Sequence, residues 1–277
     1  MITSILKRIV PGRIQHSRLV RFFPRVSAAR KYYRGTTRAI LKWGVRSREE
    51  TNYTYGLTKR NLDYLACTVA AVTGAGVEVA AGYIREAQED RVLAEHIIEM
   101  TRISKFRSFA DLRCEFGRRL GWYAFARILK PALIVETGVD KGHGAVLLAA
   151  AAKRNRAEGA ECKYLGTDIN REAGYLLAGE YKQFGEILYG DSIESLEKLT
   201  QPIGLFINDS DHSSEYEYRE YVTIKNKLDR NAVILGDNSH VSDSLATFSK
   251  ESKRNFIFFR EQPADHWYPG AGIGISY

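Results

Sequence analysis

The second half of the chain alternates short apolar runs with longer amphipathic segments. Apolar runs typical of buried strands occupy residues 133–136, 163–167, 186–189, 203–207 and 232–235. The segments between them carry helical patterns, at residues 143–157, 171–183, 192–199 and 214–228. Such alternation predicts a parallel sheet covered by helices on both faces.

A further helical pattern at residues 241–250 precedes two last apolar runs, at 255–260 and 272–277. The loop between these runs is too short for a crossover helix, so the two strands should pair antiparallel. The expected fold is therefore α/β: a doubly wound sheet of seven strands, mostly parallel, with a closing antiparallel hairpin.

Helical patterns also precede the first strand. Residues 61–72 and 77–101 have helical spacing and are separated by a break at 73–76, and a further helix is expected at 111–129. These helices should form an N-terminal cap on the sheet. The chain then divides into a basic arm (1–48), a helical cap region (49–130) and the sheet domain (131–277).

The basic character of the protein belongs to its arm. The formal net charge is +8, yet residues 1–48 hold thirteen Lys or Arg and no Asp or Glu, so the remaining chain carries −5. A nucleic-acid partner for the folded body is therefore not expected. The arm itself fits three interpretations: a flexible or loosely helical segment, a membrane-surface segment, or a mitochondrial transit peptide if the source is eukaryotic.

Targeting and redox signals are sparse. The sequence has no apolar run of 18 residues, so no membrane-spanning helix is expected. Cys67, Cys114 and Cys162 are too scattered for a disulfide framework or a zinc site. We expect a cytoplasmic protein, with peripheral membrane contact through residues 1–48 or a mitochondrial location as alternatives.

The first strand of the sheet leads into a glycine-rich loop. The strand ends at Glu136 and Thr137, and Gly138, Gly142 and Gly144 follow before the helix. Glycine allows positive φ and close approach of a ligand, and the helix N-terminus offers unpaired N–H groups. The Gly-x3-Gly-x-Gly spacing differs from the dinucleotide-binding fingerprint.

Acidic residues follow the next two strands. Asp168, beside Ile169, ends the second strand and is placed to accept hydrogen bonds from ribose hydroxyls. Asp191 and Ser192 end the third and suit an adenine amine. Asp191 is equally suited to cap the helix that begins at Ser192, and the two roles are compatible.

The ends of strands four and five carry three acids, one amide and two histidines: Asp209, Asp211, His212, Asp237, Asn238 and His240. The carboxyl ends of parallel strands share one edge of a sheet, so these groups should meet in a cleft. Carboxylate and amide oxygens suit Mg²⁺, Mn²⁺ or Ca²⁺, and the lack of thiolates makes zinc less favoured.

From Leu133 to Tyr277 the chain resembles the class I S-adenosylmethionine-dependent methyltransferases, which have a Rossmann-like fold. It is most similar to the metal-dependent small-molecule O-methyltransferases of the catechol, caffeoyl-CoA and macrolide-sugar type. The resemblance implies S-adenosylmethionine as cofactor, bound by Glu136, Thr137, Gly138, Gly142, Asp168, Ile169, Asp191, Ser192 and Asp209. It also implies a divalent metal, Mg²⁺ before others, held by Asp211, Asp237 and Asn238.

The predicted general base differs from that of the catechol-type enzymes. Where those enzymes carry a lysine after the first metal acid, this chain has His212 and Ser213. His240 lies three residues after Asp237, the spacing of the macrolide-sugar enzymes. We therefore expect His240 as the base, with His212 as the alternative, because imidazole titrates near neutral pH.

The expected reaction is metal-assisted methyl transfer to a hydroxyl of a small molecule or glycan. Three alternatives remain open at this stage: an NAD(P)-dependent oxidoreductase or epimerase, a non-catalytic S-adenosylmethionine-binding protein, and a nucleic-acid methyltransferase using the basic arm. The glycine spacing opposes the first, and the lack of any Pro-Pro pair opposes amino-directed nucleic-acid methylation. A homodimer through the N-terminal helices is a further expectation.

Overall fold

The computed structural model describes residues 18–211 and 213–277 and divides into two compact units. The first contains helix α3 (Arg18–Arg46) and residues Asp265–Trp267. Within it, Lys42 pairs with Asp265 at 3.4 Å, and the Trp43 ring meets the Trp267 ring edge-on at 5.3 Å. No described helix is long and apolar enough to cross a membrane. The second unit contains Arg48–Ala264 and Tyr268–Tyr277.

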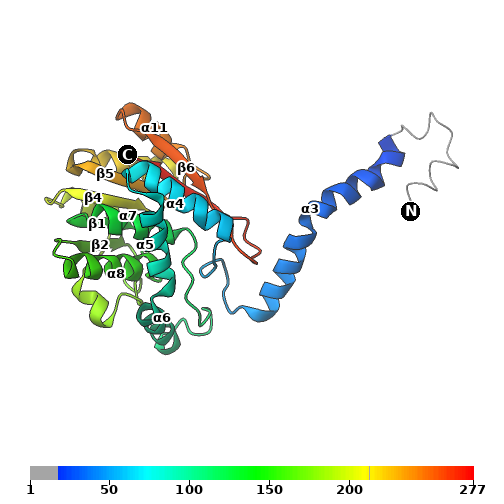
Figure 1. Cartoon of the computed structure of the whole chain (residues 1–277), viewed down its shortest axis with the longest axis horizontal. Coiled ribbons are helices and arrows are strands. Elements are labelled where there is room, and N and C mark those ends of the chain that lie inside the picture. Colours follow the sequence, from blue (N-terminus) through cyan, green and yellow to red (C-terminus); the bar gives the residue numbers. More distant parts are fainter. Residues whose placement is uncertain (1–17, 212) are drawn as a thin grey trace. The chain divides into compact units, whose positions relative to one another are not determined.

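A seven-stranded sheet forms the centre of the second unit (Figure 1), in the order β3-β2-β1-β4-β5-β7-β6. Its strands are β1 (Leu133–Thr137), β2 (Lys163–Asp168), β3 (Gly185–Tyr189), β4 (Ile203–Asn208), β5 (Leu228–Gly236), β6 (Phe256–Arg260) and β7 (Gly272–Ser276). The first five are parallel, and β7 runs antiparallel to both β5 and β6. The expected fold class is therefore confirmed.

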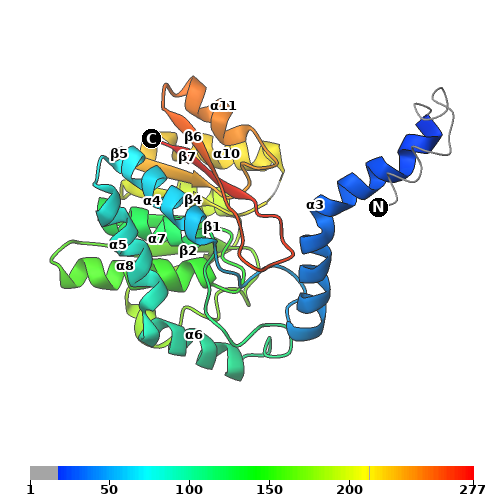
Figure 2. The ribbon, with the colours of Figure 1, turned by 45° about the vertical axis from the view of Figure 1, so that its right-hand side comes forward.

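Helices lie on both faces of the sheet (Figure 2). Each face carries its own apolar core, because neighbouring strand residues point to opposite faces. On β1, Ile134 packs in the core formed with α4 (Lys59–Thr73), α5 (Val77–Glu89), α7 (Arg119–Leu129) and α8 (His143–Ala157). Val135 packs in the core formed with α9 (Ser192–Glu197), α10 (Ser214–Ile224) and α11 (Ser244–Glu251). The helices expected to form a cap thus share one core with the sheet.

Two expected helices of the N-terminal region have different bounds. The single helix expected at 77–101 is interrupted at Asp90, whose side chain caps α6 (Arg91–Ile103) by accepting a bond from the Leu93 amide at 2.9 Å. The helix expected from residue 111 begins only at Arg119. Gly117 precedes it with φ of +52°, and its N–H donates to the carbonyl of Tyr55 at 2.9 Å.

The helix expected at 171–183 was wrong. The segment forms turns and a short 3₁₀ helix, η1 (Gly179–Gln183). Two of its amides bond to the glycine-rich loop: the Gly174 N–H donates to the carbonyl of Asp140 at 2.6 Å, and that of Leu176 to Lys141 at 3.2 Å. Its remaining backbone bonds close short turns, such as that from the Leu177 N–H to the Gly174 carbonyl at 2.9 Å. A second 3₁₀ turn, η2 (Lys225–Lys227), closes the segment expected to continue helix 214–228.

Candidate active site

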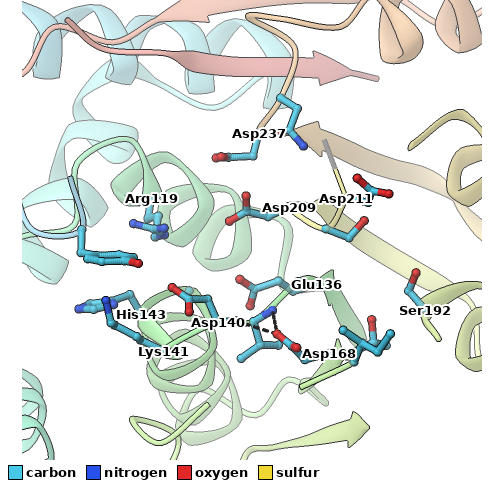
Figure 3. Close-up of a pocket in the computed structure, with 18 of the residues that line it drawn as sticks. Arg119, Glu136, Asp140, Lys141, His143, Asp168, Ser192, Asp209, Asp211 and Asp237 are labelled. Atoms are coloured by element: carbon cyan, nitrogen blue, oxygen red, sulfur yellow. Dashed lines mark hydrogen bonds between the residues drawn. The ribbon is translucent and has the colours of Figure 1, made fainter. Parts of the chain in front are cut away.

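A cavity of about 890 Å³ opens at the carboxyl ends of strands β1 to β5 (Figure 3). Among the predicted site residues, eleven line it: Glu136, Gly138, Asp168, Ile169, Asp191, Ser192, Asp209, Asp211, Asp237, Asn238 and His240. Residues from outside the strand ends complete the wall, namely Thr51, Asn52, Tyr53, Arg118, Arg119 and Tyr268. The edge of the sheet predicted to hold the site therefore contains a cavity large enough for a cofactor.

Glu136 is buried at the end of β1. Its carboxylate accepts a hydrogen bond from the Tyr164 hydroxyl at 2.5 Å. Burial raises the pKa of Glu136 to about 8, although this hydrogen bond acts in the opposite direction. A Cβ on Gly144 would lie 2.2 Å from a Glu136 oxygen, so this glycine leaves room for the carboxylate.

Gly138 holds the loop against the end of β4. Its φ is +83°, and a Cβ there would lie 2.0 Å from the carbonyl oxygen of Asp209. Both the conformation and the close backbone approach therefore require glycine at this position.

Asp168 ties the loop to β2. One of its oxygens accepts bonds from the Val139 and Asp140 amides, each at 2.9 Å, and the other accepts one from the Asn170 amide at 2.7 Å. Figure 3 shows the first two bonds as dashed lines. Asp168 thus shapes the loop, while its bond to a ribose stays a prediction.

Asp191 caps helix α9, as the alternative interpretation proposed. It accepts a bond from the Glu194 amide at 3.0 Å and another from the Tyr216 hydroxyl at 2.8 Å. The amide bond is the main reason that the pKa of Asp191 is lowered. Its contact with an adenine stays a prediction.

Glu220, on α10, hydrogen-bonds to several residues near the strand ends. It was not predicted from the sequence as a site residue. Its carboxylate accepts bonds from Thr137 at 3.0 Å and Ser210 at 2.8 Å, and also from Ser192 and Asn208. Burial raises the pKa of Glu220 to about 7 against these hydrogen bonds. The predicted residues Thr137 and Ser192 therefore hold this carboxylate.

Asp237, at the end of β5, is bound by an arginine that the sequence did not indicate. Arg118 donates to both carboxylate oxygens through its Nε and Nη2 atoms, and the two side chains are 9% and 3% exposed. Burial alone would raise the pKa of Asp237, but the charge and bonds of Arg118 outweigh it and lower that pKa.

Asp209 hydrogen-bonds to Asp237 across the cavity floor. Burial, reinforced by the negative charge of Asp237, raises the pKa of Asp209 well above its ordinary value. The two acids therefore titrate as a pair, and Asp209 is the one that ionises less readily.

The residues expected to bind a metal do not fit a divalent cation. Both Asp237 oxygens are engaged by Arg118, and the exposed Asp211 accepts bonds from the amide and hydroxyl of Ser213 at 3.1 and 3.2 Å. Over residues 18–211 and 213–277, no group of three His, Cys, Asp or Glu side chains could hold a metal ion. Asn238, which follows Asp237 in the sequence, is buried.

His240 is exposed at the cavity edge and oriented by the backbone. Its Nδ1 lies 3.3 Å from the carbonyl oxygen of Asp237. A carbonyl only accepts hydrogen bonds, so Nδ1 carries the proton and Nε2 is left as an acceptor. The alternative base, His212, lies outside the described residues.

A cluster of basic groups on one side of the cavity was missed. Figure 3 shows Arg119, Lys141 and His143 on one side and Ser192 on the other. Burial, with the charges of Arg119 and Lys141, lowers the pKa of His143 to about 3, so this imidazole is neutral. Lys141 lies over the ring of Tyr53. Arg119 lies 5.4 Å from the Trp122 ring and, within the described part of the chain, forms no ion pair.

One family model matches part of the chain. Residues 135–239 match the family model described as a methyltransferase domain. No curated protein matches the chain.

Solved structures give distant likenesses. The methyltransferase PaMTH1 of Podospora anserina, bound to S-adenosylhomocysteine, is 17% identical over 67% of this chain and 87% of its own, with a TM-score of 0.46. The O-methyltransferase TomG of Streptomyces achromogenes, in complex with S-adenosylmethionine, is 16% identical over 68% and 89%, with a TM-score of 0.47. Likeness at this level carries no argument about what this chain acts on.

Proposed function

We propose that the protein is an S-adenosylmethionine-dependent methyltransferase that methylates a hydroxyl group of a small molecule or glycan. The match of residues 135–239 to a methyltransferase domain and the strand order of the sheet support the methyltransferase part of this proposal. The observation that carries the proposal is His240, held at the cavity edge with Nε2 free to accept a proton. A hydroxyl acceptor needs such a base, since its proton must leave as the methyl group arrives.

The cavity fits the cofactor in size and in the chemistry of its walls. Asp168, Ile169 and Asp191 line the ends of β2 and β3, where they would hold the adenosine. Glu136 and Asp209 would face its methionine part, beside Gly138. S-adenosylmethionine supplies an electrophilic methyl group on its sulfonium.

Arg119 provides a cation for the methionine carboxylate. It lines the cavity, is half-buried, and forms no ion pair among the residues that the structure describes. A guanidinium pairs well with a carboxylate because its donors match both oxygens. We therefore assign Arg119 to cofactor binding.

His240 acts on the acceptor. Its Nε2 accepts the hydroxyl proton while the acceptor oxygen bonds to the methyl carbon and the carbon–sulfur bond breaks, which leaves S-adenosylhomocysteine. The backbone of Asp237 keeps the imidazole in the tautomer that this step needs. The cavity walls contribute by aligning the two reactants. No step in this proposal passes through a metal.

The decisive experiment uses labelled S-adenosylmethionine with fractionated extracts of the source cell, followed by identification of the labelled product. A label on oxygen supports the proposal, whereas a label on nitrogen or carbon contradicts it.

Replacement of the base tests the mechanism. His240→Gln should lower kcat by roughly 10²- to 10⁴-fold and leave the affinity for S-adenosylhomocysteine unchanged in calorimetry. His96→Gln is the matched control, because His96 lies on α6, bonds to the Leu176 carbonyl at 3.0 Å and does not line the cavity. Full turnover by His240→Gln would exclude this base.

A further inference from the structure

The end of β5 already contains a bound cation, the guanidinium of Arg118. It binds both oxygens of the Asp237 carboxylate, the arrangement in which arginine and carboxylate match each other best. A divalent ion at Asp237 would need those same oxygens. It would therefore have to displace Arg118 first.

Arg118 is itself held in place from its other side. Its Nη1 donates to the Tyr55 hydroxyl at 2.7 Å and to Glu261 at 3.2 Å. The Tyr55 hydroxyl also donates to the second oxygen of Glu261, at 2.9 Å. Glu261 is 1% exposed and accepts a further bond from the Ala271 amide at 2.8 Å. The guanidinium thus lies between two buried carboxylates, and moving it would remove the cation that both of them contact.

We propose that Arg118 is the built-in cation of this site and takes the place of the divalent ion that Asp211, Asp237 and Asn238 would otherwise hold. Arg118 is then a positioning residue: it fixes Asp237, and the Asp237 carbonyl in turn orients His240. The positioning role rests on the proposed function. The predicted lack of metal binding at Asp237 can be measured without turnover.

A titration of the full chain with Mn²⁺, followed by electron paramagnetic resonance, tests the first consequence. The wild type should bind no stoichiometric Mn²⁺, and Arg118→Gln, which frees the Asp237 oxygens, should bind it at least about tenfold more tightly. Arg254→Gln is the matched control and should behave as the wild type, because Arg254 bonds to the Ser276 hydroxyl at 2.9 Å and does not line the cavity. One tightly bound Mn²⁺ in the wild type that Asp237→Asn removes would overturn the proposal.

Steady-state kinetics test the positioning role. Arg118→Gln should lower kcat by roughly 10²-fold per folded molecule while the Kd of S-adenosylhomocysteine changes by less than about threefold. Arg118→Lys keeps one charge without the two-point contact and should recover part of kcat. Equal losses of affinity and kcat in both variants would overturn the positioning role. If no acceptor is ever methylated, the Mn²⁺ titration still tests whether Arg118 takes the place of a divalent ion.

Helix α3, taken by itself, combines positive charge with exposed apolar side chains. It has nine Lys or Arg and no Asp or Glu. Phe22, Phe23, Tyr32 and Tyr33 are 56%, 75%, 87% and 67% exposed. The aliphatic side chains Ile40, Leu41 and Val45 are also exposed.

We also infer that α3 binds the surface of an anionic lipid bilayer. The charges would attract acidic headgroups, and the aromatic and aliphatic side chains would enter the boundary of the acyl chains. Nucleic acid would satisfy the charges and stack on the aromatic rings, but it offers nothing to the aliphatic side chains.

Sedimentation of the full chain with vesicles tests this inference. Vesicles containing phosphatidylserine should bind it, and pure phosphatidylcholine vesicles should not. Replacing Arg30, Lys31 and Arg34 by Gln should weaken binding by roughly 10²-fold, at about fivefold per charge. Lys31→Arg keeps the charge and is the control. Equal binding to both vesicles, or tighter binding to RNA than to the anionic vesicles, would refute the inference.

Discussion

The cavity has two halves that are built differently: the cofactor half at the ends of β1 to β3, and the acceptor half at the ends of β4 and β5. Around β1 to β3, the partners of the predicted residues lie closer in sequence: Asp168 receives amides of the glycine-rich loop, 28 and 29 positions away, and Asp191 receives the amide of Glu194, three positions away. At β4 and β5, Asp237 is held by Arg118, which is 119 positions away. The cofactor half is thus held by contacts within about one strand-helix unit, 28 or 29 positions at most for these bonds, and the acceptor half depends on a far more distant segment.

This difference explains why a similar order of acidic residues does not imply the same ion. An Asp-x-Asp after β4 and an Asp-Asn after β5 would suit a divalent metal if their oxygens were free. In this protein Arg118, at the start of α7, pairs with the Asp237 carboxylate and neutralises its charge. The chemistry of a strand end is therefore decided by what packs against it.

The largest expected effect is on the stability of the acceptor half. Arg118→Met leaves the buried Asp237 carboxylate unpaired and should lower the free energy of unfolding by about 3–5 kcal/mol in urea denaturation. Arg118→Met combined with Asp237→Asn should lower the free energy of unfolding by less than Arg118→Met alone, because the double variant has no unpaired buried carboxylate at position 237.

The surface pair Lys163–Glu186, whose side chains are 52% and 53% exposed, is the control for that measurement. Lys163→Met should change the free energy of unfolding by less than about 1 kcal/mol. If Arg118→Met were no more harmful than Lys163→Met, the ion pair would not organise this half of the site.

Substitution of Gly138 should impair both the stability of the cofactor half and its affinity for the cofactor. Gly138→Ala forces a Cβ against the Asp209 carbonyl at positive φ, which should cost roughly 3 kcal/mol and weaken S-adenosylhomocysteine binding by about 100-fold in calorimetry. Gly159→Ala is the matched control, with φ of +85° and no atom within 4 Å of its Cβ. It should cost only about 1 kcal/mol of stability and no cofactor affinity. Equal behaviour of the two variants would contradict the close approach.

The smallest change from one measurement to the next, per pH unit, is a pH dependence from Glu136. Its pKa is raised to about 8 in the folded protein from an ordinary value of 4.5, so the folded state keeps a proton that the unfolded state loses. The resulting stabilisation is complete below about pH 4.5 and is lost as the pH rises through about 8. Between these values the wild type should lose up to about 1.4 kcal/mol per pH unit relative to Glu136→Gln. Parallel stability profiles of the two proteins would show that Glu136 ionises normally.

Most of the strand edge could be predicted because it follows from short patterns. A run of apolar residues that ends in Asp or Glu marks the end of a buried strand, and this places Glu136, Asp168 and Asp191 at the cavity. The helix expected at 171–183 failed for a tertiary reason. Its backbone groups bond to the loop after β1, and Gly174, with φ of +78°, permits that path.

The sequence by itself determined the order of strands and helices, the glycine-rich loop and the presence of acidic side chains at the strand ends, because each depends on neighbouring residues. Only the tertiary structure decided which charges meet. The early start expected for α7 would have placed Arg118 inside a helix; instead Gly117 ends the preceding loop, and Arg118 reaches Asp237 and Glu261. A pairing across more than a hundred residues is set by the packing of whole elements, which no local pattern records.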